Sequence, residues 1–180
     1  MDTLVRRAAL EDAEAIAAVH TRTWQVAYRG PIPDHYLDQL DQHLERRIQS
    51  WRNWISTESK NGHEVWVSDA VGHVDGFAHL GPARDSGPEA TGELYAIYVD
   101  PIRWNQGVGR ALFTQATNRL ISAGYSTAIL WVLESNVRAR RFYEVAGWTF
   151  DGGTKQESRP DGVELLEVRY RVRLHREEEE

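Results

Sequence analysis

The chain has 180 residues, no cysteine and a formal net charge of -6. This length suffices for one domain with a sizeable core, and the lack of thiols excludes disulfides, thiolate metal sites and a cysteine nucleophile. Four acidic residues form a terminal run at 177–180, so the rest of the chain carries only -2, which argues against a nucleic-acid partner.

The first part of the chain alternates between helical and strand patterns. Apolar residues recur every three or four positions in two stretches, which is typical of amphipathic helices, and prolines at 31 and 33 separate the two. Short runs rich in β-branched and aromatic residues flank them. We expect a strand over 4–8, helices over 13–30 and 34–55 with a break near Asp41, and strands over 63–70 and 73–80.

The second part continues the alternation without a linker or an internal repeat. We expect a strand over 93–99, a helix over 107–123, a strand over 126–133, a helix over 136–146, and strands over 148–150 and 163–174 joined by a polar loop. This order predicts one mixed α/β domain over residues 1–176, followed by a disordered acidic tail at 177–180.

Neither a targeting segment nor a metal motif is evident. The first seven residues are charged and lack the apolar core of a secretory signal, and no apolar run reaches the length of a membrane span. The seven histidines show no metal-ligand spacing. We therefore expect a cytoplasmic protein that binds neither a membrane nor a metal.

The most informative stretch runs from residue 92 to residue 112. Its aromatic and β-branched residues form a strand that Pro101 ends, and Gly107 and Gly109 then open a helix. Glycines allow a ligand to approach the backbone closely, and the first turn of a helix offers unpaired N–H groups to an anion. The pattern suits a phosphate-binding turn, although a Gly-x-Gly alone is weak evidence and is more often a plain turn.

A second motif follows about 30 residues later. Residues 104–109 read Trp-Asn-Gln-Gly-Val-Gly, and residues 136–148 read Asn-Val-Arg-Ala-Arg-Arg-Phe-Tyr-Glu-Val-Ala-Gly-Trp. Together they resemble the Arg/Gln-x-x-Gly-x-Gly/Ala loop and the Asn-x-x-Ala-x-x-Phe-Tyr-x-x-x-Gly-Phe pattern of the GNAT superfamily of acyl-coenzyme A dependent N-acetyltransferases. Trp104 and Trp148 depart from the usual residues.

The resemblance implies a fold and an activity. The fold is a single-domain, mostly antiparallel sheet of about seven strands, splayed in the middle and flanked by about four helices. The implied activity is transfer of an acetyl group from acetyl-coenzyme A directly to a primary amine in a ternary complex, without a metal. Many members of the superfamily form homodimers.

The resemblance also assigns cofactor-binding residues. The strand before the loop would offer free backbone groups to the pantetheine arm, and the loop would hold the pyrophosphate. Asn136 would contact either part, or serve only as a helix N-cap. Some of Arg110, Arg138, Arg140 and Arg141 could contact the ribose phosphate. The assigned residues are Ile97, Tyr98, Val99, Trp104, Asn105, Gln106, Gly107, Val108, Gly109, Arg110, Asn136 and Tyr143.

Two residues match catalytic positions of the family. Tyr143 matches the tyrosine that protonates the departing thiolate, although its place beside Phe142 also suits a core residue. Glu93 matches the glutamate that removes a proton from the acceptor ammonium, with a surface charge at the strand entry as the alternative. The backbone N–H of Ile97 would stabilise the oxyanion.

The acceptor site is less well defined by the sequence. Trp24 and Tyr28 lie four residues apart on the first helix, where they suit either the core or the acceptor pocket, and Glu93, Trp131 and the loop over 151–162 are further candidates. We expect a small-molecule or peptide amine as acceptor. A protein amino terminus or lysine, an aminoacyl-tRNA, and a non-catalytic acyl-coenzyme A sensor are the alternatives.

Overall fold

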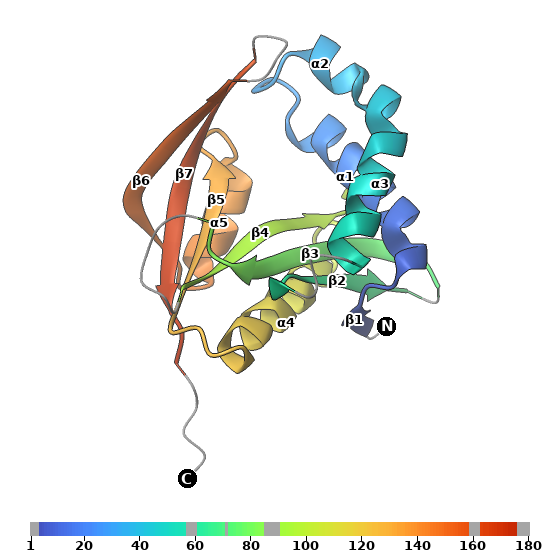
Figure 1. The fold of residues 1–180 in the computed structure, drawn as a ribbon. Helices are drawn as coiled ribbons and strands as arrows, with labels where there is room; N and C mark the ends of the chain where they lie inside the picture. Colours follow the sequence, from blue (N-terminus) through green and yellow to red (C-terminus); the bar gives the residue numbers. More distant parts are fainter. Residues whose placement is uncertain (1–3, 57–60, 71, 85–90, 159–162, 176–180) are drawn as a thin grey trace.

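The protein is described by a computed structural model that places residues 4–56, 61–70, 72–84, 91–158 and 163–175. Figure 1 shows a strongly bent sheet with helices on both faces. The strands are β1 (Leu4–Arg7), β2 (Glu64–Asp69), β3 (Val74–Pro82), β4 (Thr91–Val99), β5 (Thr127–Leu133), β6 (Thr149–Ser158) and β7 (Glu164–Arg173). The helices are α1 (Ala13–Ala27), α2 (Asp34–Asp38), α3 (Leu44–Ser56), α4 (Val108–Ser122) and α5 (Val137–Val145), with 3-10 turns η1 (Leu10–Asp12), η2 (Leu40–His43) and η4 (Pro101–Arg103).

All seven strands belong to one sheet with the order β1-β2-β3-β4-β5-β7-β6. Neighbouring strands are antiparallel except β4 and β5, which are parallel and pair only from Thr91↔Thr127 to Leu94↔Leu130. Beyond Leu94, β4 stays paired with β3 while β5 stays paired with β7, so the two strands diverge. The expected fold, a mostly antiparallel seven-stranded sheet splayed in the middle, is confirmed.

The helices cover the sheet because each buries one apolar face. Five residues of α4 pack onto β3, β4 and β5 together with Tyr143 of α5. On the opposite face, α1 and α3 pack against β2 and β3 around Phe77. A third cluster joins α1 and α2 to β5 and β7 through Tyr28, Leu37, Leu133 and Leu165.

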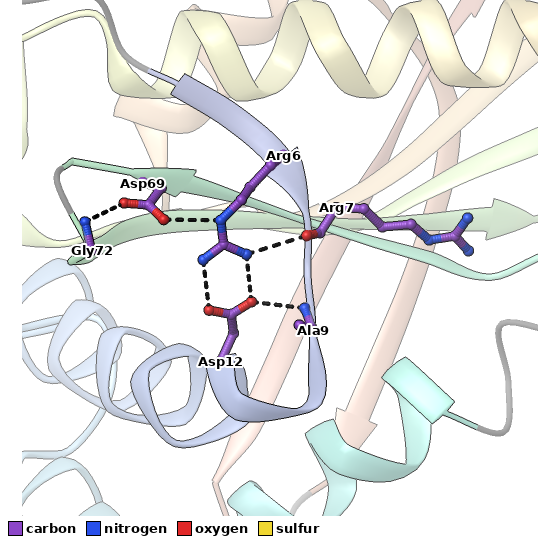
Figure 2. A network of polar contacts seen from close by, with 6 residues as sticks. All are labelled: Arg6, Arg7, Ala9, Asp12, Asp69 and Gly72. Carbon is purple, nitrogen blue, oxygen red and sulfur yellow. Dashed lines mark hydrogen bonds and ion pairs between the residues drawn. The ribbon is translucent and has the colours of Figure 1, made fainter.

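An ion-pair network fixes the first strand to the rest of the domain (Figure 2). Arg6 of β1 donates from Nη1 and Nη2 to Asp12 at 2.7 and 2.9 Å, and from Nε to Asp69 at 2.9 Å. The Arg6 hydrogen bond holds the pKa of Asp12 below its usual value. Asp12 also accepts the Ala9 N–H, so one guanidinium links β1, the start of α1 and the end of β2.

The helical region expected over 34–55 is divided into α2, η2 and α3, in keeping with the expected break near Asp41, and the described residues contain five α-helices. One expected element is corrected. The expected polar loop after Phe150 is a strand as far as Ser158, because a register shift between Phe150 and Thr154 absorbs Asp151 and the two glycines. The tail at 177–180 lies outside the described residues.

Within the described ranges, no helix is long and apolar enough to cross a membrane. The same residues contain no group of three or more histidine and carboxylate side chains arranged to hold a metal ion.

Candidate active site

A cavity of about 640 Å³ opens where β4 and β5 diverge. Its walls come from elements far apart in the sequence: the second half of α1, β4 from Leu94 to Val99, the start of α4, the end of β5, α5 and β7. The parallel pairing of β4 with β5 from Thr91 to Leu94 holds these elements around the opening. The cluster that joins α1 and α2 to β5 and β7 does so as well.

The β4 backbone presents unpaired groups to this cavity. His79 pairs with Ala96 and Leu80 with Leu94, so Tyr95 is the extra residue of a β-bulge. The Asp100 N–H donates to the Asp75 carbonyl on the β3 side. Backbone groups alternate in direction along a strand, so those of Ile97 and Val99 point toward the opening.

The Val99 carbonyl is already occupied. It accepts a hydrogen bond from Trp104 Nε1 at 2.8 Å and another from Thr23 Oγ1 at 3.1 Å. An oxygen with two donors has no lone pair left for a ligand. Of the two residues expected to face the pantetheine arm, Ile97 therefore offers both its N–H and its carbonyl, while Val99 offers its N–H.

The loop before α4 has the backbone of an anion site. Asn105 has φ +62° and Gly107 has φ +86°, and Gly107 is the N-cap of α4. A Cβ on Gly109 would meet only Val99 Cγ2, at 3.7 Å, so the space in front of this turn is open. The first turn of α4 thus directs N–H groups and the positive end of its dipole into the cavity.

Three arginines surround this end of the cavity, namely Arg103, Arg110 and Arg138. Arg138 lies over the Trp104 ring, 4.0 Å from its centroid, and donates to Asn105 Oδ1 at 3.3 Å. Trp104, which departs from the motif, thereby joins the end of β4 to α5. Two of the expected cofactor residues do not line the cavity. The Gln106 side chain donates to the Ile102 carbonyl, and Val108, the first residue of α4, is buried in the core.

Tyrosines gather at the centre of the cavity. Tyr28, Tyr98 and Tyr143 all line it, and the Tyr28 side chain is hydrogen-bonded to Tyr98 and Asn136. Burial raises the pKa of all three phenols, so each keeps its proton at neutral pH. Asn136 Oδ1 also accepts the Ala139 N–H at 3.1 Å, so this residue caps α5 and faces the cavity at once.

Glu93 lies elsewhere. Its side chain is fully buried, and both carboxylate oxygens are bound to Arg84: the Arg84 N–H donates to Oε2 at 2.9 Å and the guanidinium to Oε1 at 2.5 and 3.1 Å. Glu93 does not line the cavity. Its assignment as general base and acceptor contact stays a prediction that this geometry does not favour, because neither oxygen is directed at the space where an acceptor would bind.

The remaining acceptor candidates do line the cavity. Trp24 and Tyr28 are in edge-to-face contact with ring centroids 4.8 Å apart, and Trp131 lies on the opposite wall, on β5. No described residue of the 151–162 segment lines the cavity. The sequence analysis missed Glu167 of β7, which does. Strand alternation places Glu167 on one face with Leu165, but only the β5–β7 register shows that this face meets the opening.

Comparison with known proteins identifies the family to which this arrangement belongs. Residues 21–148, well over half of the chain, match the Acetyltransferase (GNAT) family. The chain belongs to this family. The resemblance drawn from the two motifs is thereby confirmed.

Several GNAT relatives cover most of the chain. An uncharacterized N-acetyltransferase of Bacillus subtilis, YuaI, is 40% identical over 133 residues, which are 73% of this chain and 72% of the relative. A probable N-acetyltransferase of Mycobacterium tuberculosis, Rv2775, is 26% identical over 93% of this chain and 92% of its own length. Mycothiol acetyltransferase of Stackebrandtia nassauensis is 42% identical, but over only 45% of this chain and 26% of that protein.

Solved GNAT structures share the fold. PaiA N-acetyltransferase of Thermoplasma acidophilum, solved in complex with coenzyme A, has a TM-score of 0.73 at 19% identity and covers 96% of this chain and 99% of its own. YncA of Salmonella typhimurium, solved with acetyl-CoA, has a TM-score of 0.70 at 20% identity over 100% of this chain and 98% of its own. At this level of identity the likeness concerns the fold alone.

Proposed function

We propose that this GNAT protein is an N-acetyltransferase that moves the acetyl group of acetyl-coenzyme A to a primary amine of a small molecule or peptide in a ternary complex. The observation that carries the proposal is a single cavity that joins three features. Free backbone groups of Ile97 and Val99 lie on one wall, the N-terminus of α4 also lines the cavity, and Tyr143 of α5 lines it as well.

The residues present fit coenzyme A along its length. The N–H groups at the start of α4, with Arg103, Arg110 and Arg138 around them, suit the charged phosphates. The amide groups of the pantetheine arm would pair with Ile97 and with the Val99 N–H, as an added strand does. Acetyl-coenzyme A, when bound, supplies a thioester carbonyl that an amine can attack.

Two groups of the chain would then serve the transfer. The Ile97 N–H is a donor for the carbonyl oxygen of the thioester, where negative charge develops during attack. Tyr143 carries its proton at neutral pH, where a thiolate leaving the acetyl group can accept it. Asn136 and Tyr98 hold the neighbouring Tyr28 through hydrogen bonds.

The acceptor would occupy the wall formed by Trp24, Tyr28 and Trp131. Aromatic rings in the lining of a cavity of this size suit a compact organic amine or the end of a peptide. The acceptor enters the same cavity as the donor, which is the arrangement that direct transfer requires, since both reactants must be held together.

The test is release of coenzyme A from acetyl-coenzyme A, followed with a thiol reagent against polyamines, amino acids, aminoglycosides and short peptides. The protein adds no background signal because it contains no cysteine. We expect amine-dependent release with at least one of these classes. Coenzyme A binding without release by any amine would instead favour a macromolecular acceptor or an acyl-coenzyme A sensor.

A further inference from the structure

Among the described residues that line the cavity, Glu167 is the only one with a carboxylate. It lies on β7, paired with Leu133 of β5 on one side and Lys155 of β6 on the other, so the sheet fixes its position. Its side chain is 21% exposed, which leaves it accessible from the cavity while most of it is shielded from water.

The surroundings of Glu167 already bind an ammonium group. Lys155 Nζ lies 3.0 Å from Glu167 Oε2 and 4.5 Å from the centroid of the Trp131 ring. A carboxylate beside an aromatic face is the combination that attracts a primary ammonium, through a charge-assisted hydrogen bond and a cation–π contact. Trp131 and Glu167 both line the cavity, so an ammonium entering from that side meets the same two groups.

Glu167 also acts on the centre of the cavity. Burial raises the pKa of Tyr98, whose hydroxyl is hydrogen-bonded to Tyr28, and the negative charge of Glu167 adds to this rise. The other charged groups near it are Lys155 on β6 and Arg84, whose pKa its charge helps to raise, while Arg169 lies over the far part of Trp131 with its Nε bound to Asp151. Glu93, by contrast, has both oxygens bound to Arg84.

We propose that Glu167 binds the ammonium of the acceptor and takes its proton, and that Lys155 occupies this position while the acceptor is absent. The inference rests on the proposed function, which it deepens by naming a base and a class of acceptor. The acceptor is a primary alkylammonium whose apolar part lies against Trp24 and Trp131.

The step balances as follows in bonds and protons. One proton passes from the ammonium nitrogen to a Glu167 oxygen, and the nitrogen lone pair forms the C–N bond to the acetyl carbonyl carbon. The C–S bond breaks, and the sulfur takes the proton of Tyr143. As the intermediate collapses, the nitrogen loses its second proton, which restores the Tyr143 phenol. Glu167 returns its proton to solvent, so the products are the amide, coenzyme A and one proton.

The experiment compares Glu167→Gln with Glu164→Gln, which removes an equal charge from an exposed position on the same strand. We expect Glu167→Gln to lower kcat/KM for the amine by about 10²- to 10⁴-fold and to abolish the rise in rate with pH on the acidic limb. Its affinity for coenzyme A should stay that of the wild type, and Glu164→Gln should leave every parameter unchanged.

A second readout does not depend on turnover. Calorimetric titration of the coenzyme A complex with the amine should show at least tenfold weaker binding in Glu167→Gln and tighter binding in Lys155→Gln, which removes the competing ammonium. Glu167→Asp keeps the charge and should retain part of the amine binding. It replaces Glu167→Gln in the comparison if circular dichroism shows that Glu167→Gln is unfolded.

The outcomes separate the two proposals. Suppose that the wild type acetylates an amine and that Glu167→Gln has the same rate and the same affinity for that amine. This result overturns the role of Glu167 and leaves the acetyltransferase proposal standing. Loss of the acidic limb in Glu93→Gln instead of Glu167→Gln also overturns it. If no amine promotes coenzyme A release, the proposed function fails, whereas Glu167-dependent binding of an amine would still support the ammonium site.

Discussion

Tyr143 combines two environments in one side chain. Its ring packs against Phe113 and Phe142 in the core under α4, with centroids 6.0 and 5.6 Å away, and the residue also lines the cavity. Only 7% of its surface is exposed. Burial raises its pKa, so the phenol keeps its proton over the whole neutral range, as an ordinary tyrosine also does.

Replacing Tyr143 by Phe removes the hydroxyl and keeps the ring. We expect kcat to fall by about 10²-fold or more, the range typical of general acid catalysis, while the Kd of coenzyme A changes little because the ring contacts persist. Steady-state kinetics with the active amine, together with a coenzyme A titration, measure both. A variant with wild-type kcat would show that another group protonates the sulfur.

The residues of the site were predicted to different degrees by the sequence, for a physical reason. Asn136 and Tyr143 lie in one short motif on one helix, so local spacing is enough to place both at the cavity. Glu93 and Glu167 are distinguished only by long-range contacts. Glu93 forms an ion pair with Arg84, whereas the pairing of β7 with β5 places Glu167 at the opening. Neither contact has a local sequence signal.

At the scale of elements, Trp104 connects the end of β4, the phosphate loop and α5. Its Nε1 donates to the Val99 carbonyl, and its ring makes a cation–π contact with Arg138. Arg138 in turn donates a hydrogen bond to Asn105. This arrangement holds Arg138 at the edge of the cavity and keeps the positive-φ turn at Asn105 in place. Trp104 thus forms a brace between the end of β4, the loop before α4 and α5.

Trp104→Phe and Trp104→Ala separate the two parts of this brace. The first loses the Nε1 hydrogen bond, worth about 1 kcal/mol, and should weaken coenzyme A binding by about fivefold. The second also loses the cation–π contact, worth about 0.5–1 kcal/mol more, and should weaken it by about 20-fold. Calorimetry measures both Kd values. Equal affinities for Trp104→Ala and the wild type would contradict the role of the brace.

The elements themselves were mostly predictable, and the exceptions share a cause. Helix α4 and strands β4 and β5 differ from expectation by only one or two residues at their ends, because their periodicity and their terminal Gly and Pro residues agree. The continuation of strand β6 past Phe150 was missed because Gly152 and Gly153 resemble a turn. In the sheet they form a bulge, with Gly152 at φ +87°, and pairing with β7 continues past it to Ser158.

At the scale of the whole molecule, the cavity exists because the sheet consists of two arms, β1-β2-β3-β4 and β5-β7-β6. Only four residue pairs between β4 and β5 join them. The strands on either side have their own antiparallel partners, and the cluster of Tyr28, Leu37, Leu133 and Leu165 holds the arms together on one side of the opening. Composition and periodicity indicate a mixed sheet but do not give the point at which two parallel strands separate. That point followed from the family resemblance.

The stability of the whole domain should depend on pH through His79. This side chain is 5% exposed, between α3 and the sheet, in contact with Trp51, Trp54 and Tyr95. Burial, together with the charges of His63 and Arg84, lowers its pKa to about 3. In the unfolded chain a histidine titrates near 6.5. Between these values the unfolded state holds a proton that the folded state does not.

The free energy of unfolding should therefore fall as pH decreases below about 6.5, by up to ~1.4 kcal/mol per pH unit. The carboxylates with lowered pKa, Asp12, Glu64, Asp69 and Asp151, contribute in the same direction only below their unfolded values of 3.8 to 4.5. Over the range from pH 6.5 to 4.5, His79 should account for a loss of about 2 kcal/mol. Urea unfolding of wild type and His79→Phe across this range measures the slope, which should flatten in the variant. Equal slopes in the two proteins would mean that His79 already takes up a proton in the folded state, and that the cluster around it admits charge or water.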